Sequence, residues 1–528
     1  MSNHAYESAA ALRPSSNGPI PISTLCERFS LAPASAEDAA ALNDLSILGV
    51  SVDSADTAPG ELFVGLPGFT VHGARFAADA VASGAVAVLT DADGAQIVHQ
   101  TAPGTPVLVH SDPRAVVGPL SAEVYHHPAR GLVTTAVTGT NGKTTTAYFL
   151  DAILSAHVGG CMVAGTVELR VGERSVESPR TTVEAPVLQR MMALAVEDKV
   201  GAASLEASSH AIVLHRLDGI VVDVAGFTNL QRDHLDFHKT MEGYLEAKAQ
   251  LFTPEHARRG VVCVDDQWGA ALAAEAPIEI DRVRAYPGET PADWWVSDAA
   301  VSLTDSATTF TLHGPDGEKI EASCPLPGLV NVQNAALALV MAIRAGVPAA
   351  TAAAALAGAH NIPGRMQRIS QRDGRRGLCI VDFAHTPDAM ELALKAVRPI
   401  TPGRLIVVFG SDGDRDQGKR PMLGEVCARL ADVLVVTDEN PRSEDPQLIR
   451  NAILEGVRGV RPDLKDVEEI TTWRGDAVRR GVELCGPDDT VIVTGKGHEP
   501  FLEMAGEFIR YNDAPVMAEA VEEKWGRA

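Results

Sequence analysis

The chain contains 528 residues, and 69 acidic against 45 basic side chains give it a formal net charge of −24 at pH 7. This length predicts about three domains with ample buried core. Nucleic acid and anionic membrane surfaces are poor partners for so acidic a chain, so compact ligands are the expected partners.

The first residues and the cysteines indicate the compartment. Met1–Pro21 is rich in Ser, Ala, Asn and Pro and lacks the basic start and apolar core of a signal peptide. We expect about the first 20 residues to be disordered, and no apolar run is long enough to span a bilayer. Seven scattered cysteines without a C-x-x-C pair predict neither a disulfide framework nor a cysteine zinc site. A cytoplasmic monomer without membrane insertion is expected.

The first domain is predicted over residues 1–129. Ile47–Asp53 and Glu61–Leu66 are short apolar runs on either side of a Pro-Gly turn, as expected of strands. Ala74–Ser83 has helical spacing, and Ala85–Leu89 follows as a further strand. This alternation predicts a small α/β domain.

The second domain, residues 130–362, opens with a predicted phosphate loop. A β-branched run at 134–138 leads into a glycine-rich turn that ends in Lys-Thr-Thr, as where a buried strand feeds a phosphate loop and a helix. The glycines let backbone N–H groups approach phosphate oxygens, while Lys143 supplies charge and Thr144 a hydroxyl for Mg²⁺. Val137 stands where the common pattern has its first glycine. Nucleotide binding is predicted, and these residues alone leave ATP or GTP open. The predicted contacts are Gly139, Thr140, Asn141, Gly142, Lys143, Thr144 and Thr145.

Two further strands of this domain end in polar clusters. Ala202–Leu205 leads directly into a cluster that begins with Glu206. Val221–Phe227 leads into a segment that contains His234. Because open parallel sheets bind ligands at the carboxyl ends of their strands, we expect a mainly parallel sheet with a site at this edge. Lys248 lies on a later stretch with helical spacing, where a lysine by default occupies a solvated face.

The third domain, residues 363–528, repeats one arrangement four times. In each repeat an apolar strand delivers charged residues at its C-terminal end, and helical stretches such as Pro387–Val397 lie between the strands. This recurrence predicts a Rossmann-like, doubly wound parallel sheet with a ligand site along one edge. The whole chain is therefore predicted to be an α/β protein of three domains with a P-loop ATPase domain at its centre. The four predicted strands are Leu378–Phe383, Arg404–Phe409, Asp432–Thr437 and Thr490–Thr494.

Six motifs follow one another along nearly the whole chain: Gly139–Thr145, Glu206–His210, Thr228–Asp236, Ala247–Lys248, Pro363–Met366 and Asp382–Asp388. Together they closely resemble the motifs of the Mur ligases, the ATP-dependent enzymes that add amino acids to the UDP-muramyl peptide of bacterial cell walls. The segments around Arg415, Arg442 and Glu499 are similar to those of members that add meso-2,6-diaminopimelate to UDP-N-acetylmuramoyl-L-alanyl-D-glutamate. The resemblance implies an amide-forming ligase of peptidoglycan precursor synthesis that releases ADP and phosphate.

The resemblance also implies roles for individual residues. ATP would phosphorylate the γ-carboxylate of the D-glutamate, and the incoming amine would attack the acyl phosphate, which is chemistry of positioning and charge neutralisation. Lys143 would bind the transferring phosphoryl group, while Thr144 and Glu206 would hold one Mg²⁺. His234 would help to hold a second Mg²⁺, and Lys248 would carry a CO₂-derived carbamate as an oxygen ligand. Further implied contacts are Asn331 and Arg365 for ATP; Ser54, Thr181, Thr182, Ser208 and Arg216 for the UDP-muramyl substrate; and Arg415, Asn440, Pro441, Arg442, Gly495 and Glu499 for the amino acid.

Five positions depart from the family's usual residues. Ala55 stands where an arginine follows Asp-Ser in the family, and Val183 stands where a proline often follows Thr-Thr. Phe383 replaces a tyrosine, Cys263 an asparagine and Val330 a phenylalanine. Each change loses or alters at most one contact, and at Ala55 that contact would be to the nucleotide sugar.

Three alternatives stand beside this interpretation. The chain could be a Mur ligase that adds L-lysine, a folylpolyglutamate synthetase-like ligase, or a nucleotide-binding switch that forms no bond. Arg442 could clamp the distal carboxylate of diaminopimelate bidentately while Glu499 pairs with an ammonium group, and lysine would leave that arginine unpaired. A switch does not need four polar clusters around a second substrate.

Overall fold

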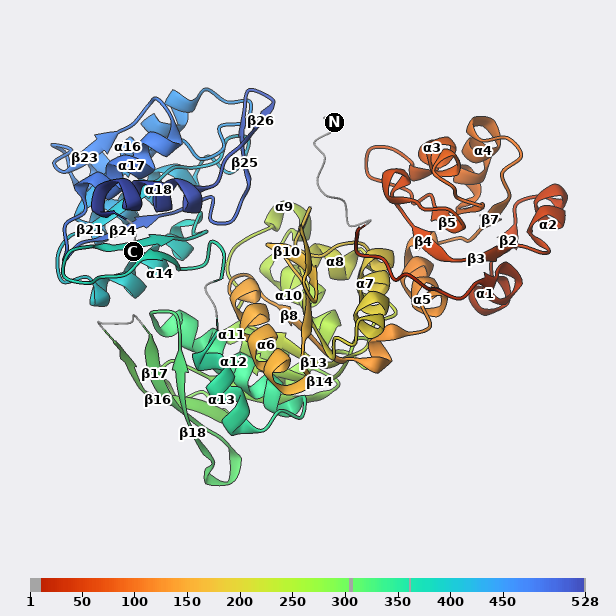
Figure 1. Cartoon of the computed structure of the whole chain (residues 1–528), viewed down its shortest axis with the longest axis horizontal. Helices are drawn as coiled ribbons and strands as arrows, with labels where there is room; N and C mark the ends of the chain where they lie inside the picture. The colour runs from red at the N-terminus through yellow and green to blue at the C-terminus, as the bar shows by residue number, and fades with distance from the viewer. Residues whose placement is uncertain (1–10, 303–306, 360–361, 527–528) are drawn as a thin grey trace. The chain divides into compact units, whose positions relative to one another are not determined.

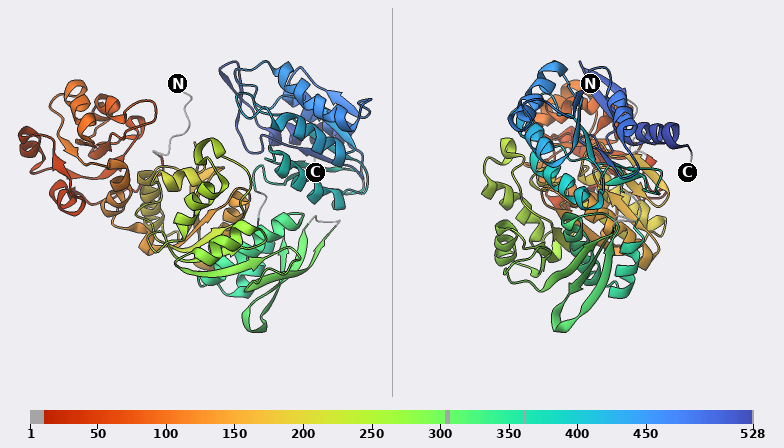
Figure 2. Two further views of the ribbon diagram at one scale, coloured as in Figure 1. Left: turned by 180° about the vertical axis from the view of Figure 1, so that it is seen from behind. Right: turned by 90° about the vertical axis from the view of Figure 1, so that its left-hand side faces the viewer.

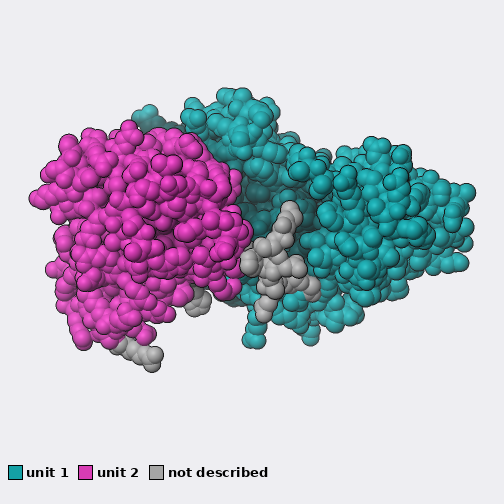
Figure 3. All heavy atoms as spheres, turned by 90° about the horizontal axis from the view of Figure 1, so that it is seen from above, with its two compact units in different colours: residues 1–294, 337–355 teal, residues 295–336, 356–528 magenta. Residues whose placement is uncertain are grey.

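The computed structural model describes residues 11–302, 307–359 and 362–526. The chain forms two compact units, residues 1–294 with 337–355 and residues 295–336 with 356–528, which are coloured separately in Figure 3. Each unit has its own hydrophobic core. In the described part of the chain, no helix combines the length and the apolar composition needed to cross a membrane.

The first unit begins with a small α/β fold. Its five-stranded sheet has the order β2-β7-β6-β5-β4, in which only β2 is antiparallel to its neighbour. The strands are β2 (Ala32–Pro33), β4 (Gly49–Ser51), β5 (Glu61–Val64), β6 (Ala87–Thr90) and β7 (Val107–Val109), with a separate pair β1 (Ile20–Pro21) and β3 (Ser46–Ile47). The helices are α1 (Ile22–Phe29), α2 (Ala36–Leu42), α3 (Ala77–Ala82), α4 (Ala92–Thr101) and α5 (Pro113–Val124), and the 3₁₀ turns are η2 (Ser54–Asp56), η3 (Gly73–Phe76) and η4 (Pro128–Gly131). The strands predicted at 47–53, 61–66 and 85–89 are thus present.

The N-terminal segment is more ordered than its composition suggests. Residues 1–10 lie outside the described residues, but the backbone N–H of Ser15 donates to the Glu197 carboxylate at 3.0 Å. The Asn17 amide donates to the carbonyl of Val124, also at 3.0 Å. The expected disorder therefore does not extend over residues 11–21, because groups distant in sequence supply the hydrogen bonds that a polar stretch cannot make within itself.

The larger sheet of the first unit places the phosphate loop. Its strands have the order β11-β10-β9-β12-β8-β13-β14-β15, parallel from β9 to β15 and antiparallel at the β10 and β11 edge. The strands are β8 (Val133–Thr138), β9 (Cys161–Ala164), β10 (Glu168–Val171), β11 (Arg174–Glu177), β12 (Ala202–Glu206), β13 (Val222–Phe227), β14 (Ala257–Cys263) and β15 (Glu279–Arg284). The helices of this region are α6 (Lys143–Val158), α7 (Ala185–Glu197), α8 (Ser209–Val213), α9 (Leu235–His238), α10 (Met241–Ala249) and α11 (Gln267–Glu275), with the 3₁₀ turn η5 (Gln250–Phe252). Two more helices, α12 (Leu329–Arg344) and α13 (Ala349–Ala357), belong to this unit only over residues 337–355. This confirms a mainly parallel central sheet.

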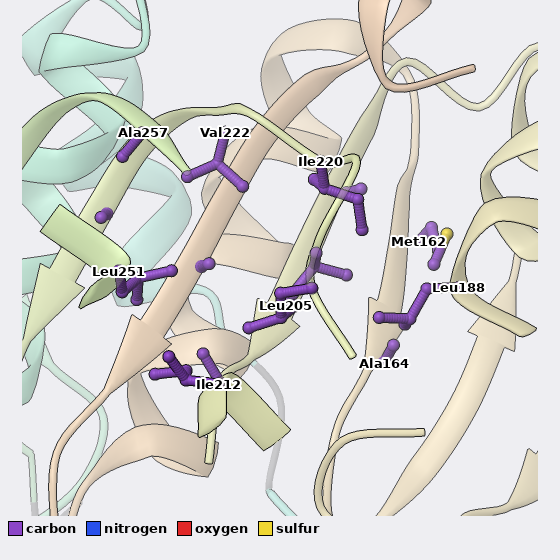
Figure 4. Close-up of a cluster of buried hydrophobic side chains, with 14 of the residues drawn as sticks. Met162, Ala164, Leu188, Leu205, Ile212, Ile220, Val222, Leu251 and Ala257 are labelled. Carbon is purple, nitrogen blue, oxygen red and sulfur yellow. The ribbon is translucent and has the colours of Figure 1, made fainter. Parts of the chain in front are cut away.

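Register brings the polar strand ends together. Val137 at the end of β8 pairs with Glu206 on β12, and Thr138 pairs with Phe227 on β13. Below these ends, Leu205, Met162 and Leu188 lie in one buried cluster between β12, β9 and α7 (Figure 4). The core therefore fixes the strands while their carboxyl ends present polar groups at one edge.

The second unit contains three consecutive antiparallel strands and the C-terminal α/β fold. The first consists of β16 (Trp294–Val301), β17 (Thr308–His313) and β18 (Lys319–Cys324), with a 3₁₀ turn η6 (Pro315–Gly317). The second is a six-stranded sheet of order β19-β20-β24-β21-β22-β23, in which only β19 is antiparallel. Its strands are β19 (Gln367–Ser370), β20 (Leu378–Val381), β21 (Leu405–Phe409), β22 (Val433–Val436), β23 (Val467–Glu469) and β24 (Thr490–Val493), and β25 (Phe501–Met504) and β26 (Glu507–Arg510) form a hairpin. The four strands predicted here are β20, β21, β22 and β24.

Helices cover both faces of this C-terminal sheet (Figures 1 and 2). Val408 and Val491 face a cluster that includes Val478 of α17 and Met517 of α18. Alternate residues such as Val407 point to the opposite face and are equally buried. The helices are α14 (Pro387–Val397), α15 (Lys419–Leu430), α16 (Pro446–Val460), α17 (Arg474–Leu484) and α18 (Asp513–Trp525), with the 3₁₀ turn η7 (Arg398–Ile400). Near-continuous apolar strands buried on both faces confirm the predicted doubly wound sheet.

Candidate active site

The predicted phosphate loop joins β8 to α6. Gly139 has φ +144°, and a Cβ there would lie 1.8 Å from Thr228 Oγ1, so only glycine fits this turn. Gly142 has φ +90° and is the N-cap of α6, but it supplies no side-chain cap. The positive end of the α6 dipole therefore lies at this loop, where it favours an anion such as phosphate.

The segment after β13 holds this loop in place. Asn229 Oδ1 accepts from the backbone N–H of Asn141 at 3.0 Å, and Thr228 Oγ1 donates to the Asn141 carbonyl at 2.6 Å. The Asn141 amide in turn donates to Gln231 Oε1 at 2.7 Å. The Thr-Asn pair thus shapes the loop that would cradle phosphate, which is a role its sequence position alone does not reveal.

Two predicted metal ligands lie together at the end of β12. Glu206 is 1 % exposed, and its Oε2 accepts from Thr144 Oγ1 at 3.0 Å. Thr166 also donates to this carboxylate, through its backbone N–H at 2.8 Å and its hydroxyl at 2.9 Å. A carboxylate beside a hydroxyl at the start of a phosphate-binding helix is an oxygen pair of the kind that Mg²⁺ prefers.

The oxygen pair is only part of a coordination shell. In the described residues, no group of three or more His, Cys, Asp and Glu side chains is placed to hold a metal ion. Mg²⁺ keeps several waters and shares phosphate oxygens in nucleotide sites, so one carboxylate and one hydroxyl fit such an ion. The loop lysine lies beside them, with Lys143 Nζ 3.1 Å from the Gly139 carbonyl and 2.9 Å from that of Thr140.

Three histidines gather next to the loop. The His234 ring lies 4.9 Å from that of His210, and the His238 ring lies 5.4 Å from His210 and 4.9 Å from Tyr244. His234 is the N-cap of α9, with φ +52°. Burial and the neighbouring cations lower the pKa of His234, and burial with the adjacent His210 lowers the pKa of His238 to about 4. These imidazoles are neutral at physiological pH, the form that binds metals.

Lys248 is buried, although its spacing suggested a solvated face. It is 1 % exposed on α10, and its Nζ donates to the Gly139 carbonyl at 2.8 Å. The ammonium also lies over the Tyr244 ring, 4.5 Å from its centroid. Burial, followed by the charge of Lys143, lowers the pKa of Lys248 well below its ordinary value. Desolvation thus favours the neutral, nucleophilic amine at the phosphate loop.

Four of the five residues predicted to bind the nucleotide sugar lie next to Glu206. Thr182 Oγ1 donates to the Glu206 carbonyl at 2.7 Å and accepts from the backbone N–H of Ser208 at 3.0 Å. Arg216 Nη1 donates to the Thr182 carbonyl at 3.1 Å. The Thr181 hydroxyl lies 3.2 Å from the Thr166 hydroxyl, which can accept a hydrogen bond from it while donating to Glu206. Ser54, the fifth, begins η2 in the small N-terminal sheet domain.

The residues predicted to bind the amino acid follow β21, β22 and β24. The backbone N–H of Gly413 donates to the Asn440 carbonyl at 2.8 Å, and the backbone N–H of Ser443 donates to Asp414 Oδ2 at 3.1 Å. These bonds tie the loop that carries the exposed Arg415 to the loop that carries Pro441 and Arg442.

The Arg442 guanidinium lies near two carboxylates but does not use all of its hydrogen-bond donors. Its Nη2 lies 4.0 Å from Asp412 and its Nε 3.8 Å from Glu503, beyond hydrogen-bond range. Arg442 Nε is buried and has no hydrogen-bond partner among the described residues. An arginine that is attracted by nearby carboxylates and still has an N–H donor available can bind the carboxylate of a ligand.

A carboxylate lies beside this arginine loop. Asn440 Nδ2 donates to Glu499 Oε2 at 3.0 Å, in the segment that begins at Gly495. The side chain of Glu499 is 37 % exposed. The structure therefore brings Asn440 and Glu499 together.

The comparisons with known proteins agree in one result. The model of the Mur ligase family catalytic domain matches residues 46–125, that of the Mur ligase middle domain residues 137–342, and that of the Mur ligase glutamate ligase domain residues 364–497. The chain belongs to the Mur ligase family.

Full-length relatives of this Mur ligase carry a more specific name. The chain is 43 % identical to a UDP-N-acetylmuramoyl-L-alanyl-D-glutamate–2,6-diaminopimelate ligase of Streptomyces avermitilis, over 92 % of this chain and 94 % of that protein. It is 42 % identical to a UDP-N-acetylmuramyl-tripeptide synthetase of Leifsonia xyli, over 95 % and 96 %. A solved UDP-N-acetylmuramoyl-L-alanyl-D-glutamate–2,6-diaminopimelate ligase superposes with a TM-score of 0.64 at 32 % identity, covering 91 % of this chain and 95 % of its own.

The remaining predicted ATP contacts of this Mur ligase lie in the second unit. Asn331 is 6 % exposed on α12, and its amide donates to the Pro327 carbonyl at 2.8 Å. The Arg365 guanidinium stacks over the Phe383 ring, 4.4 Å from its centroid. Phe383, a departure from the usual tyrosine, therefore keeps an aromatic face for this arginine.

Sequence reasoning missed several charged residues behind the amino-acid site. The Arg474 and Asp513 pair is completely buried at 2.8 Å, and Arg474 also donates to the carbonyls of Asp438 at 2.9 Å and Thr494 at 2.8 Å. It thereby ties the end of β22 to the end of β24. Only tertiary structure reveals this pair, because neither residue lies in a motif.

Glu439 is a second missed residue. It immediately precedes the predicted Asn440–Arg442 motif and is 3 % exposed, and its Oε2 has no hydrogen-bond partner among the described residues. Burial and the nearby Asp412 carboxylate raise its pKa to about 8. Its place beside Asn440 could have singled it out from the sequence.

Proposed function

We propose that this protein is an ATP-dependent ligase that joins meso-2,6-diaminopimelate to UDP-N-acetylmuramoyl-L-alanyl-D-glutamate in peptidoglycan precursor synthesis. One observation carries the proposal: a chain similar over 92 % of its length to a ligase of this name has a phosphate loop with an adjacent oxygen pair. It also has a C-terminal site in which a carboxylate is bonded to the loop that carries Arg442. The first suits phosphoryl transfer, and the second suits an amino acid with two charged ends.

The phosphate loop would direct phosphoryl transfer. Backbone N–H groups at the start of α6 would bind the phosphates, and Lys143 would leave the loop carbonyls to neutralise charge on the transferring group. Thr144 and Glu206 would hold Mg²⁺, which supplies charge neutralisation when bound. The γ-carboxylate of the substrate's D-glutamate would then accept the phosphoryl group to give an acyl phosphate.

Lys248 would become a ligand after reaction with CO₂. Its buried amine has a strongly lowered pKa, so the neutral form is available to attack carbon dioxide. Nζ would form a bond to the carbon and release a proton, which leaves a carboxylate on nitrogen. The cation at the Gly139 carbonyl would thus be replaced by an oxygen ligand suited to Mg²⁺.

The nucleotide-sugar peptide would bind beside Glu206. Thr181, Thr182 and Ser208 offer hydroxyl groups there, and Arg216 supplies a positive charge. Ser54 would contact the nucleotide end from the N-terminal sheet domain. This arrangement places the anionic substrate next to the phosphate loop.

The C-terminal site would determine which amino acid is bound. Arg442 would clamp the distal carboxylate of diaminopimelate, with Arg415 in support, and Glu499 would bind an ammonium group near Gly495. Asn440 and Pro441 would shape the loop between these charges. L-Lysine has no distal carboxylate, so it would leave Arg442 desolvated without a partner.

Coupled ATP hydrolysis tests the proposal. Phosphate release from ATP should require both the UDP-muramyl dipeptide and diaminopimelate, and GTP should replace ATP poorly. Release of phosphate without either substrate would favour a nucleotide-binding switch. Size-exclusion chromatography with light scattering and cell fractionation would test the predicted monomeric state and cytoplasmic location.

A further inference from the structure

Lys496 is a buried lysine that the mechanism does not use. Its side chain is completely buried, and its Nζ donates to Asn440 Oδ1 at 2.9 Å, to Glu499 Oε2 at 3.0 Å and to the carbonyl of Phe501 at 2.6 Å. An ammonium group has three hydrogens, so all three donors are used within the protein. Lys496 has no donor left for a substrate.

The lysine fixes the orientation of a neighbouring amide. Asn440 Oδ1 accepts from Lys496 and also from the backbone N–H of Glu503, at 3.2 Å. Its Nδ2 must therefore point the other way, where it donates to Glu499 Oε2 at 3.0 Å. One Nδ2 hydrogen of Asn440 remains for a ligand.

The same lysine and amide both bind one oxygen of the Glu499 carboxylate, which is predicted to contact the substrate. Glu499 Oε2 accepts from both Lys496 and Asn440, whereas no hydrogen bond joins Oε1 to any part of the chain that the structure describes. With Oε2 held from two directions, the carboxylate cannot rotate without breaking charge-assisted bonds. Oε1 is thus presented in a fixed direction on a side chain that is 37 % exposed.

We infer that Lys496 is a positioning residue for amino-acid recognition, which acts through Glu499 and Asn440 and does not touch the substrate. The inference rests on the proposed function, because it assumes that the ligand of Glu499 is the ammonium group of the amino acid. A lysine that merely filled the core would contribute to stability without favouring one substrate. A lysine that orients Glu499 should affect binding of the amino acid without affecting binding of ATP or of the UDP-muramyl dipeptide.

The test is a double-mutant cycle with Lys496→Met and Glu499→Gln. Lys496→Met keeps most of the apolar stem and removes the three donors. We expect its KM for diaminopimelate to rise about 10- to 100-fold, the loss expected for hydrogen bonds to a charged group, with nearly unchanged KM for ATP and for the dipeptide. The double variant should be little worse than Glu499→Gln alone, since each change breaks the same unit.

A matched control uses another lysine of the same domain. Lys524 on α18 donates to the carbonyls of Val482 at 2.9 Å and Glu483 at 2.8 Å, on the far end of α17. Lys524→Met should leave all three KM values unchanged. A uniform change in every KM by Lys496→Met, or effects that add to those of Glu499→Gln, would overturn the inference.

Circular dichroism and thermal melting show whether Lys496→Met folds. If it does not fold, a second variant tests the positioning role of Lys496. Asn440→Ala removes the other bond to Glu499 Oε2 and one acceptor of Lys496. The same selective rise in KM and the same non-additivity with Glu499→Gln are expected, and independent effects would refute the positioning role. Failure of the proposed function is distinguishable, because the wild type would then show no turnover that depends on diaminopimelate.

Discussion

The substitution Arg442→Ala probes the chemistry that separates diaminopimelate from lysine. The backbone of this residue is anchored independently of its side chain: its N–H donates to the Glu503 carbonyl at 3.0 Å, and its carbonyl accepts from Ala505 at 2.7 Å. Removal of the guanidinium should therefore leave the loop in place. The two nearby carboxylates lie 3.8 and 4.0 Å from the guanidinium, so few internal hydrogen bonds are lost.

The size of the effect follows from burial. Truncation of one partner in a buried, hydrogen-bonded charge pair costs about 2–5 kcal/mol. Because the Arg442 side chain is 24 % exposed, we take the lower part of this range, about 2–3 kcal/mol. That corresponds to a ~30- to ~150-fold loss of kcat/KM for diaminopimelate. The kcat/KM for L-lysine, which has no distal carboxylate, should change little.

Competition between the two amino acids measures this difference. The variant and the wild type are supplied with ATP, the UDP-muramyl dipeptide and both amino acids, and the two tripeptide products are quantified by mass spectrometry. Arg479→Ala is the matched control, because that arginine forms exposed pairs with Glu519 at 2.8 Å and Glu523 at 2.9 Å. An Arg442→Ala enzyme with wild-type activity and wild-type preference would refute the assignment of Arg442.

Other predictions address the phosphate loop, the buried lysine and the buried glutamate. Lys143→Ala should lower kcat about 100- to 1,000-fold without a change in melting temperature, and near-normal turnover by the folded variant would contradict its role. Lys248→Ala should be inactive, and small carboxylates should partly restore turnover; an intact-mass spectrum of active enzyme without an added CO₂ would exclude the carbamate. Lower pH protonates the Lys248 amine, so activity should fall on acidification and recover with bicarbonate. The pKa of Glu439 is raised from 4.5 to about 8 in the folded state, so between these pH values the folded state binds more protons than the unfolded state. The free energy of unfolding should therefore fall as the pH rises from 4.5 to 8. Urea titrations at a series of pH values should show a smaller fall for Glu439→Gln, and a pH dependence equal to that of the wild type would contradict this role of Glu439.

The sequence predicted those parts of the site that depend on local patterns. A glycine-rich turn after a β-branched strand is a local signal, and the structure has the loop between β8 and α6 where it was expected. The pairing of Thr144 with Glu206 could also be anticipated, because parallel strands end at the same edge of a sheet. The roles assigned to these residues remain predictions.

Features that depend on tertiary packing could not be predicted from the sequence. Periodicity placed Lys248 on a solvated face, but α10 turns it toward the Gly139 carbonyl and the Tyr244 ring. The left-handed N-cap position of His234 likewise has no local signal in the sequence. The buried Arg474 and Asp513 pair joins residues 39 positions apart, and no local pattern signals such a contact.

This enzyme forms an amide bond between meso-diaminopimelate and the dipeptide's D-glutamate. The bond can be tested by incubating the wild-type protein with ATP, Mg²⁺, UDP-N-acetylmuramoyl-L-alanyl-D-glutamate and a mixture of diamino acids, and by determining the mass of the product. We predict a single tripeptide with the mass of the diaminopimelate adduct, formed together with an equal amount of ADP. A lysine adduct formed equally well, or ADP formed without any tripeptide, would contradict the account.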